Sequence, residues 1–486
     1  MRVVRRWGPL FGLGVIALTA AWLRFQDLSA TMYWGADQAE HGIDERSIFL
    51  GHHLLHLVLG QVSGIPNYRP GAAFYWLQAP FYLALNFQPL ADAAAEAFYG
   101  TVAVVATWWL ARSIFGEGAA IVAAALAALA PPLVDAGRVG WAPNMFPLLV
   151  PLSMALVLAS TRRRWWVAFL AGATVAVTLQ MDEAGIVVLI GVAAWLAWER
   201  PQGWLRNAVA AAAGGLVAWS PWLVWNAIHH WQMFRAIAHV VRTREVPGLV
   251  GQVGEPLQLV VPRVTGMMLG LPAPLAAVVV AAGIAAATWL AFAAGGQTRS
   301  GARLILCLHM GAFAVYLSLR TRFQSYYLNP WEAVLPVTVA AIVGAAALLP
   351  MLGTIRVAAV AGLGVAMAAA SLPVAAAAPS RTVACGYGNL ERATLAIAHQ
   401  APGTYRLEWW DPYPWDSDHA HGPGTDEPQF ILAWRGRMAP TSTASDGYAV
   451  AMNPLDRPQR EIKRVRKSWP RLEVIQIDGC YAALHL

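Results

Sequence analysis

A tight cluster of acidic and histidine side chains follows the first long apolar run of the chain. It comprises Asp37, Glu40, His41, Asp44 and Glu45. On a helix, residues three and four positions apart share a face, so Asp37, Glu40 and His41 can point into one cleft. A carboxylate in such a cleft can accept the proton of a hydroxyl group as a general base. We rank Asp37 first and Glu40 second for this role. The alternative is a helix that lies in a membrane interface with its polar face in water.

The apolar run at residues 7–25 decides on which side of a membrane this cluster lies. The run is long enough to span a bilayer and carries only Arg24, near its end. Arg2, Arg5 and Arg6 precede it, and basic residues favour the cytoplasmic side. We therefore expect a retained helix rather than a removed signal, a cytoplasmic N-terminus, and an acidic cluster on the outer face.

The composition is that of a protein with many membrane spans. Of the 486 residues, 58% are hydrophobic and 13% are charged, against roughly 25% charged in soluble domains. Eleven apolar runs could cross a membrane, at 7–25, 94–111, 118–136, 143–160, 165–180, 184–198, 206–228, 271–296, 303–319, 331–350 and 357–378. With the N-terminus inside, every predicted cytoplasmic connection contains at least one arginine, as the positive-inside bias requires. This alternation puts the C-terminus outside, in a bacterial cytoplasmic (inner) membrane.

The chain divides into two parts by composition. Residues 1–378 form the predicted all-α transmembrane domain, whose first outer loop is 26–93, and residues 379–486 form a small extracytoplasmic α/β domain. Residue patterns in the second part predict a helix at 389–400 and short strands at 404–410, 429–434, 447–452 and 472–477. A basic run at 457–467 is explained best as a solvated helix face, with a lipid-headgroup site as the alternative.

Aromatic and basic residues gather in the second half of the first outer loop. Tyr68 and Arg69 precede a Pro-Gly pair, and Tyr75 lies in the aromatic segment that follows. A guanidinium group can bind two phosphate oxygens at once, so Arg69 could hold a lipid phosphate; alternatively, it anchors the loop among lipid headgroups. His52 and His56, four residues apart, are explained better as interfacial histidines than as metal ligands.

The order of four segments along the chain resembles that of a known family. These are an Asp-x-Ala sequence at Asp37, a Gly-aromatic-Tyr segment that runs from Gly71 to an Ala-Pro ending at Pro80, an Arg-x-x-Trp-x-Pro-Asn segment at 138–144, and Gln180 at the end of a later span. In this order they resemble the polytopic glycosyltransferases of the C-type fold, in particular the bacterial relatives of the protein O-mannosyltransferases and of the lipid A aminoarabinose transferase. The resemblance covers residues 1–345.

The resemblance implies a transferase that moves a sugar from a polyprenyl-phosphate carrier to an acceptor hydroxyl on the outer face of the membrane. Asp37 corresponds to the catalytic base of that family, and outer-loop arginines hold the carrier phosphate, for which the candidates are Arg69, Arg138, Arg320 and Arg322. The predicted substrate-binding set is completed by Tyr68, Tyr75, Trp141, Asn144, Gln180, Asp182, Tyr326 and Tyr327. An inverting single displacement needs one base and one phosphate clamp. No cofactor is therefore expected, and a divalent metal held by the acidic loops ranks second.

Three departures from the family pattern leave the substrates open. Ala142 stands where a second asparagine is common, and Asp182 stands where a histidine often follows the glutamine. Glu40 and His41 replace an arginine or glutamate that relatives often carry after the aspartate. The donor sugar is therefore not predicted, and the acceptor could be a protein, a lipid or a glycan.

Two other classes of protein fit the composition, namely a secondary transporter and an envelope scaffold without catalytic activity. A transporter would place ionisable groups near the bilayer midplane, whereas the predicted spans have nearly charge-free middles and the polar groups gather at one surface. No basic stripe with interleaved aromatic residues marks a nucleic-acid surface, so membrane lipids are the expected surroundings. Cys385 and Cys480 could form a disulfide or stay free thiols.

Overall fold

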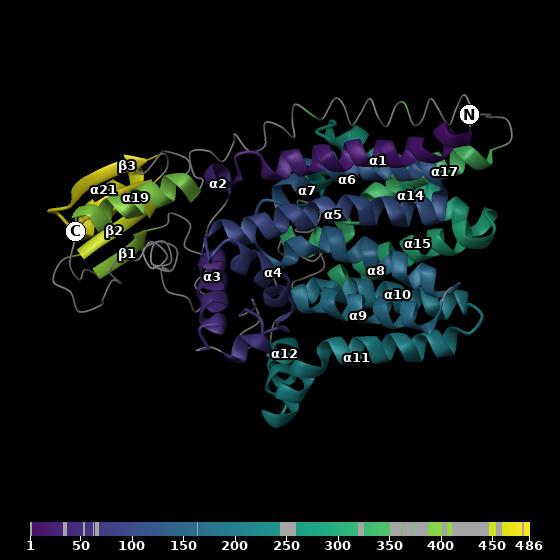
Figure 1. Cartoon of the computed structure of the whole chain (residues 1–486), viewed down its shortest axis with the longest axis horizontal. Helices are drawn as coiled ribbons and strands as arrows, with labels where there is room; N and C mark the ends of the chain where they lie inside the picture. Colours follow the sequence, from purple (N-terminus) through teal and green to yellow (C-terminus); the bar gives the residue numbers. More distant parts are fainter. Residues whose placement is uncertain are drawn as a thin grey trace.

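The structure is a computed structural model, and it is a helical bundle with a small C-terminal sheet at one end (Figure 1). It describes residues 2–32, 36–51, 54–61, 63, 68–162, 164–243, 259–318, 325–349, 362, 372, 387–400, 406–410, 447–452, 459–478 and 481–486. The predicted domain boundary between residues 378 and 379, the long loop at 411–429 and the strand at 429–434 lie outside these ranges, as do Cys385 and Cys480.

The bundle consists of long helices that run side by side along one direction (Figure 1). They are α1 (Arg2–Phe25), α5 (Leu90–Phe115), α6 (Glu117–Leu129), α8 (Phe146–Ser160), α9 (Trp165–Met181), α10 (Ile186–Glu199), α11 (Trp204–Ile228), α14 (Ala273–Ala293), α15 (Gly296–Ser318) and α17 (Leu335–Leu348). Small residues let some of these helices touch backbone to backbone. A Cβ atom at Gly172 of α9 would lie 1.8 Å from the carbonyl oxygen of Ala211 in α11, and one at Gly214 would lie 1.9 Å from that of Phe169. Glycine at both positions therefore permits the close packing that is typical of helix pairs in membranes.

Within the described ranges, five helices are long and apolar enough to cross a membrane. They are Leu90–Phe115, Ala142–Ser160, Trp204–Ile228, Ala273–Ala293 and Tyr326–Leu348, and the shorter apolar helices are Leu10–Phe25, Glu117–Leu129 and Trp165–Met181. Helices occupy every predicted run except 357–378, which lies outside the described residues apart from 362 and 372. The chain is thus a helical protein with several candidate spans, and the count of eleven spans stays a prediction.

One end of the bundle carries the shorter elements of the connecting loops. These are α2 (Leu28–Thr31), α3 (Ala36–Phe49), η1 (Leu54–Leu57), α4 (Ala73–Ala84), α7 (Pro131–Ala136), η2 (Ala142–Met145), η3 (Glu183–Gly185), α12 (Gln232–Thr243), η4 (Ser325–Leu328) and α16 (Asn329–Glu332). Figure 1 shows that α3 crosses this end of the bundle roughly at right angles to the long helices. The first outer loop predicted from the sequence therefore forms a layer across the helix ends.

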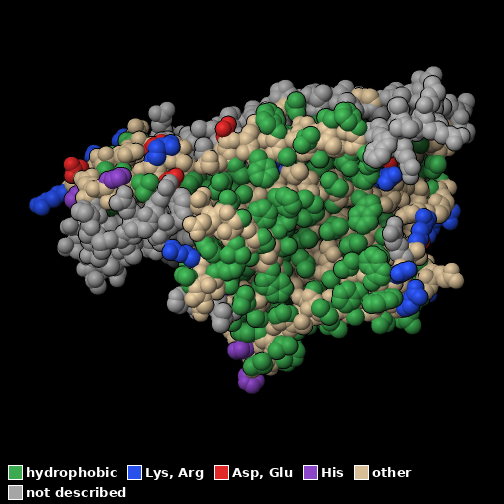
Figure 2. Space-filling model, viewed as in Figure 1, with side chains coloured by type: hydrophobic (Ala, Val, Ile, Leu, Met, Phe, Trp, Pro, Cys, Tyr) green, Lys and Arg blue, Asp and Glu red, His purple; other side chains and the backbone are tan. Residues whose placement is uncertain are grey.

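The outer surface of the bundle separates apolar from basic side chains. On the face drawn in Figure 2, hydrophobic side chains cover the flank of the bundle, and basic side chains gather at the end opposite the C-terminal sheet and on the C-terminal part itself. Arg112 at the end of α5 and Arg299 in the first turn of α15 lie at the former end, where Thr298 donates a 2.8 Å hydrogen bond to the carbonyl of Ile114. Arginines also occur at the end with α3, where Arg46 of α3 and the exposed Arg235 and Arg242 of α12 lie.

The C-terminal part is a four-stranded sheet with strand order β1-β2-β4-β3, packed against a helix. Its elements are α19 (Tyr387–Gln400), β1 (Arg406–Trp410), β2 (Gly447–Met452), α21 (Gln459–Ser468), β3 (Glu473–Asp478) and β4 (Tyr481–His485). β1 and β2 are parallel, and the other neighbours are antiparallel. The helix and three strands agree with the predicted ranges, whereas β4 was not predicted. Among the side chains of the basic helix α21 that the structure describes, Ile462 and Val465 are the only buried ones, and the Lys and Arg side chains are exposed, as a solvated face requires.

The C-terminal part and the first outer loop share one hydrophobic cluster. Leu28, Met32 and Ala39 pack with Tyr387, Leu390, Ala393 and Ile397 of α19 and with Ala93 and Ala97 of α5. The backbone N–H of Tyr387 also donates a 3.0 Å hydrogen bond to the carbonyl of Met32. The segment that leads into α3 is therefore held from one side by α5 and from the other by α19.

Candidate active site

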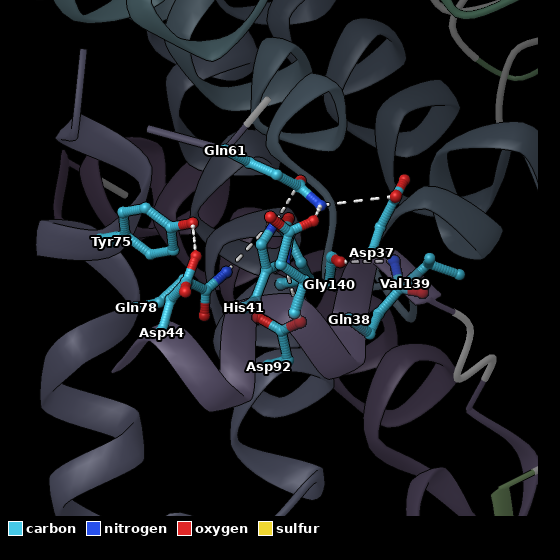
Figure 3. Close-up of polar contacts among 12 residues, drawn as sticks. Asp37, Gln38, His41, Asp44, Gln61, Tyr75, Gln78, Asp92, Val139 and Gly140 are labelled. Atoms are coloured by element: carbon cyan, nitrogen blue, oxygen red, sulfur yellow. Dashed lines mark hydrogen bonds and ion pairs between the residues drawn. The ribbon is translucent and has the colours of Figure 1, made fainter. Parts of the chain in front are cut away.

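The polar face of α3 holds two partly exposed carboxylates that share one amide donor. Gln61 Nε2 lies 3.0 Å from Glu40 Oε2 and 3.4 Å from Asp37 Oδ1 (Figure 3). The two acids are three residues apart on α3, so helical spacing puts them on one face, as predicted. Gln61, which follows the isolated bridge between Leu59 and Gly71, reaches them from the other half of the loop. The structure therefore brings Asp37 and Glu40 together, and it adds Gln61, which the sequence did not single out.

His41 lies beneath this pair and is bonded at both ring nitrogens. Nε2 lies 2.6 Å from Gln61 Oε1, and Nδ1 lies 3.3 Å from Asp92 Oδ2 of α5. Both His41 and Asp92 are only 1% exposed. Burial lowers the pKa of His41, but the hydrogen bond and charge of Asp92, with smaller contributions from Asp37 and Gln61, outweigh it and raise the pKa to about 9. The contact with Asp92 therefore favours the imidazolium form of His41.

The inner part of α3 adds a second set of buried polar groups. Tyr75 of α4 donates a 2.6 Å hydrogen bond to Asp44 Oδ2, and His56 Nδ1 lies 3.1 Å from the same oxygen. Burial raises the pKa of Glu45 to about 8, and the nearby charge of Asp92 contributes in the same direction. Asp44 and Glu45 are thus buried, whereas Asp37 and Glu40 are partly exposed.

Arg69 has the features expected of an anion ligand. Its backbone is fixed, because its N–H contacts Met233 Sδ at 3.3 Å and its carbonyl accepts a 2.9 Å hydrogen bond from Trp222 Nε1. Within the described part of the chain, its Nη1 is buried without a hydrogen-bond partner. Burial and Asp44 raise the pKa of Tyr75; the charge of Glu40 adds to this effect, while the charge of Arg69 opposes it. Glu40 and Arg69 therefore lie within electrostatic range of the same hydroxyl group.

Arg138 has a different task from the phosphate contact predicted for it. It is 4% exposed, and its Nη1 donates hydrogen bonds of 3.1, 3.0 and 3.0 Å to the carbonyls of Leu23, Arg24 and Gln26. These carbonyls belong to the end of α1, where a helix leaves acceptors unpaired. The side chain therefore caps α1, and its geometry gives no support to a phosphate contact. Arg320 and Arg322 lie outside the described residues.

Two predicted aromatic residues meet across the loops that follow α7 and α15. The rings of Trp141 and Tyr326 are edge to face with centroids 4.9 Å apart, and the Tyr326 and Tyr327 rings are 4.6 Å apart. Asn329, which was not predicted, joins the same loops by donating a 3.2 Å hydrogen bond to the carbonyl of Pro143. These contacts hold the aromatic group in one place, as a surface for a sugar ring would require.

Asn144 and Gln180 are both engaged with backbone groups. Asn144 Nδ2 donates a 2.9 Å hydrogen bond to the carbonyl of Val139 in its own loop. Gln180 is buried and donates a 3.1 Å bond to the carbonyl of Ala218 in α11. A Cβ atom at Gly71 would lie 2.0 Å from Gln180 Oε1, so the start of α4 rests directly on this side chain. Gln180 therefore positions the loop that carries Arg69.

Asp182 and Glu183 form an acidic turn close to Tyr68 and to the first outer loop. Asp182 begins η3, where its Oδ1 accepts a 2.8 Å hydrogen bond from the N–H of Ala184, and Ser63 donates a hydrogen bond to Glu183. Burial and the adjacent Glu183 raise the pKa of Asp182. Burial also raises the pKa of Tyr68, and the charges of Glu183 and Asp182 add to it. Because Ser63 is two residues from Gln61, this turn borders the group around Asp37.

Two residues that are hydrogen-bonded within this group, Asp92 and Gln61, were not singled out in the sequence, for different reasons. Asp92 falls at the end of the first outer loop that the sequence predicts. The structure places it in the first turn of the apolar helix α5, with Glu96 one turn later. Acidic residues in an apolar membrane helix are a signal for a functional site. Gln61 carries no such signal, because its contacts depend on the path of the loop. Among the described residues, no group of three or more His, Cys, Asp or Glu side chains has the geometry to hold a metal ion.

Known proteins similar to this chain belong to the same kind of family that the order of its motifs resembles. A family model described as dolichyl-phosphate-mannose-protein mannosyltransferase matches residues 70–225. No curated protein matches the sequence. Among solved structures, ArnT from Cupriavidus metallidurans bound to undecaprenyl phosphate has a TM-score of 0.62 at 14% identity, with 99% of this chain and 98% of that chain covered.

A second group of solved structures is more distant. The Archaeoglobus fulgidus oligosaccharyltransferase in complex with Zn and sulfate has a TM-score of 0.53 at 17% identity, over 81% of this chain and 56% of that chain. The same protein tethered to an acceptor peptide has a TM-score of 0.55 at 15% identity, over 90% and 64% of the two chains. The resemblance inferred from the motifs is confirmed, and the chain has the fold of the C-type polytopic glycosyltransferases.

Proposed function

We propose that this chain is a membrane glycosyltransferase that moves a sugar from a polyprenyl-phosphate carrier to an acceptor hydroxyl on the outer face of the membrane. The acceptor oxygen attacks the anomeric carbon while Asp37 takes the hydroxyl proton, with Glu40 as the second candidate base. The bond from the acceptor oxygen to the anomeric carbon forms as the bond to the phosphate oxygen breaks, and the electron pair of the broken bond leaves with the lipid phosphate. A single displacement of this kind inverts the configuration and needs no enzyme nucleophile.

The observation that carries the proposal is the arrangement of charges around Gln61 and Tyr75. Gln61 binds both Asp37 and Glu40, which stay partly exposed and can therefore reach a substrate. Within the described residues, Arg69 has a buried nitrogen without a hydrogen-bond partner, near the same group. A buried donor that lacks a partner costs free energy, and a phosphate oxygen would recover it through a charge-assisted hydrogen bond. A base and an anion ligand close together are the two parts that this displacement requires.

The likeness to ArnT bound to undecaprenyl phosphate supports a polyprenyl phosphate as the carrier. We assign Arg69 to its phosphate, with Arg320 and Arg322 as further candidates. Trp141, Tyr326 and Tyr327 would contact the sugar ring, because their rings already form one packed group. No metal is assigned to the reaction.

The outer face is supported by the distribution of basic side chains. The arginine group at the ends of α5 and α15 would lie in the cytoplasm by the positive-inside bias, which puts α3 and the C-terminal sheet outside. A donor whose lipid tail lies in the bilayer can then present its phosphate at the level of α3. The N-terminus would be cytoplasmic in this arrangement.

The test is sugar transfer by purified protein in detergent or liposomes, with a panel of polyprenyl-phosphate sugars and with lipid, glycan and peptide acceptors. Asp37→Asn should lower transfer by about 100-fold or more, and Asp37→Asn combined with Glu40→Gln should abolish it. Glu473→Gln, an exposed acid on β3, is the matched control and should transfer normally. Undiminished transfer by the double variant would refute the assignment of the base. Loss of transfer in EDTA, restored by a divalent cation, would refute the metal-free reaction.

A further inference from the structure

We infer that Asp92, His41 and Gln61 form a positioning relay that orients the catalytic carboxylates Asp37 and Glu40 from the membrane helix α5. This inference rests on the proposed function, because it assigns a role relative to the proposed base. None of the three relay residues needs to touch substrate. Their task is to hold one amide N–H group against the two acids on the outer face of α3.

The hydrogen bonds of the relay fix the orientation of the Gln61 amide. Its nitrogen faces two carboxylates, Asp37 and Glu40, and its oxygen faces His41 Nε2 at 2.6 Å. The opposite orientation would put the amide oxygen against two acceptors, so the contacts themselves select the one described. This orientation requires that His41 Nε2 carries a proton, because Gln61 Oε1 can only accept.

The other ring nitrogen of His41 must carry a proton as well. Nδ1 lies 3.3 Å from Asp92 Oδ2, and an ionised Asp92 accepts from it, so that both ring nitrogens donate and the ring is an imidazolium. Asp92 supplies the negative charge that makes this form stable in a buried place. The ring lies between Phe74, with centroids 4.7 Å apart, and Tyr75, at 6.0 Å, so packing fixes its plane. The charge state of His41 thereby determines which end of the Gln61 amide points toward the proposed base.

Loss of the Asp92 charge has a definite consequence in this arrangement. With asparagine at position 92 the ring is neutral and keeps one proton, because the charge that held the second is gone. If the asparagine amide group donates to Nδ1, that proton stays on Nε2 and the Gln61 orientation survives. If the asparagine carbonyl accepts from Nδ1–H instead, Nε2 has no proton. Two acceptors, Nε2 and Gln61 Oε1, would face each other, and the amide would turn over. Its oxygen would then repel Asp37 and Glu40, so the acids would leave the orientation that serves the reaction.

A surrounding frame makes the relay rigid. Gln38 of α3 donates a 2.8 Å hydrogen bond to the carbonyl of Gly140, and Asp92 packs directly against Gly140. The titratable groups that face His41 are Asp37 and Glu45 from α3, Tyr75 from α4 and Asp92 from α5. Of these acids, Asp92 is the one hydrogen-bonded to the His41 ring in the described part of the chain. Its replacement therefore tests the relay while the charges of Asp37 and Glu45 stay in place.

The experiment compares Asp92→Asn, Gln61→Glu and His41→Asn in the sugar-transfer assay of the full chain. Gln61→Glu and His41→Asn should each lower kcat by about 100-fold, as a displaced catalytic group does. Asp92→Asn should lower kcat where the asparagine carbonyl takes the place of the carboxylate. KM for the lipid-linked donor should change less than about threefold in all three because Arg69 is untouched. His399→Asn and Gln400→Glu, exposed at the end of α19, are matched controls and should keep both constants. If the three residues had a purely structural role, the variants would yield less folded protein. The protein that did fold would then have wild-type kcat.

The pH profile gives a second readout. Transfer by the wild-type chain should fall as the pH rises through about 9, when His41 loses its proton. In Asp92→Asn the fall should occur at a pH lower by about one unit or more, because the charge that holds the proton is gone. Wild-type kcat and an unmoved alkaline limb in a folded Asp92→Asn variant would overturn the inference. If Asp92→Asn does not fold, Gln61→Glu provides the test instead. A wild-type kcat in Gln61→Glu would then overturn the inference. Unchanged transfer by Asp37→Asn with Glu40→Gln would instead overturn the proposed function.

Discussion

Replacement of Gly140 by alanine should disturb the site without changing a single polar group. A Cβ atom at Gly140 would lie 2.2 Å from Asp92 Cγ, 2.3 Å from Oδ2 and 2.6 Å from Cβ, all of which are far below van der Waals contact. Oδ2 is the atom that accepts the hydrogen bond from His41. Asp92 is 1% exposed, so it has little free space into which it can move. The added methyl group must therefore push the carboxylate away from His41.

The expected effect is the sum of two terms. Overpacking a buried site costs about 1–3 kcal/mol, and loss of a hydrogen bond to a charged group costs about 1.5–3 kcal/mol. The variant should thus be destabilised by roughly 2.5–6 kcal/mol. Transfer should fall by about 100-fold because the Gln61 amide loses its orientation. The effect on kcat should exceed the effect on KM for the donor.

The assay is thermal unfolding together with transfer kinetics of the folded fraction. Gly14→Ala in α1 is the matched control, because a Cβ atom there has no heavy atom within 4 Å. It should leave Tm unchanged or raise it slightly, since alanine favours a helix by about 0.5–1 kcal/mol over glycine. A Gly140→Ala variant with wild-type Tm and wild-type kcat would refute the packing argument and the dependence of the site on Asp92.

Three further predictions concern the neighbouring groups. Arg69→Lys should raise KM for the lipid-linked donor by about tenfold, and Arg69→Gln by more, because a single ammonium cannot replace the guanidinium fork; an unchanged KM in both would exclude Arg69 as the phosphate ligand. The pKa of Glu45 is about 8 in the folded chain, against 4.5 as its ordinary value in the unfolded chain. Between these pH values the folded form must keep Glu45 protonated while the unfolded form ionises it, so the stability of the folded chain falls as the pH rises. Glu45→Gln, neutral throughout, should therefore lose less Tm than the wild type between about pH 5 and pH 8.5, and equal losses would contradict the buried position. Gly71→Ala should push Gln180 off the carbonyl of Ala218 and lower stability by about 2–4 kcal/mol, which a melting experiment on the purified protein would detect or deny.

The sequence predicted the helices and the outer-loop acids well because both follow from local patterns. Apolar runs of spanning length can only be helices in a bilayer, and a three-residue spacing puts Asp37 and Glu40 on one face whatever the rest of the chain does. The order of the motifs likewise predicted the fold. These features depend on neighbours along the chain, so no knowledge of distant contacts was needed.

The roles of Arg138, Gln61 and Asp92 could not be predicted because each depends on a distant segment. Arg138 looks like an anion ligand in the sequence, and only the approach of α1 turns its guanidinium onto three carbonyls. Gln61 acts because the loop folds back over α3, and Asp92 acts because α5 places it under His41. β4 was missed because its short alanine-containing sequence lacks a clear alternation until its partners β2 and β3 are in place.

The contact between Met32 and Tyr387 sets an order of events during synthesis of the chain. The segment that carries the proposed base is made first, whereas α19, which covers it, is made after more than 380 residues. Until then the cluster of Leu28, Met32 and Ala39 lacks most of its buried apolar partners. The cover over the segment that leads to Asp37 is therefore complete only when residues from the far end of the chain have folded against it.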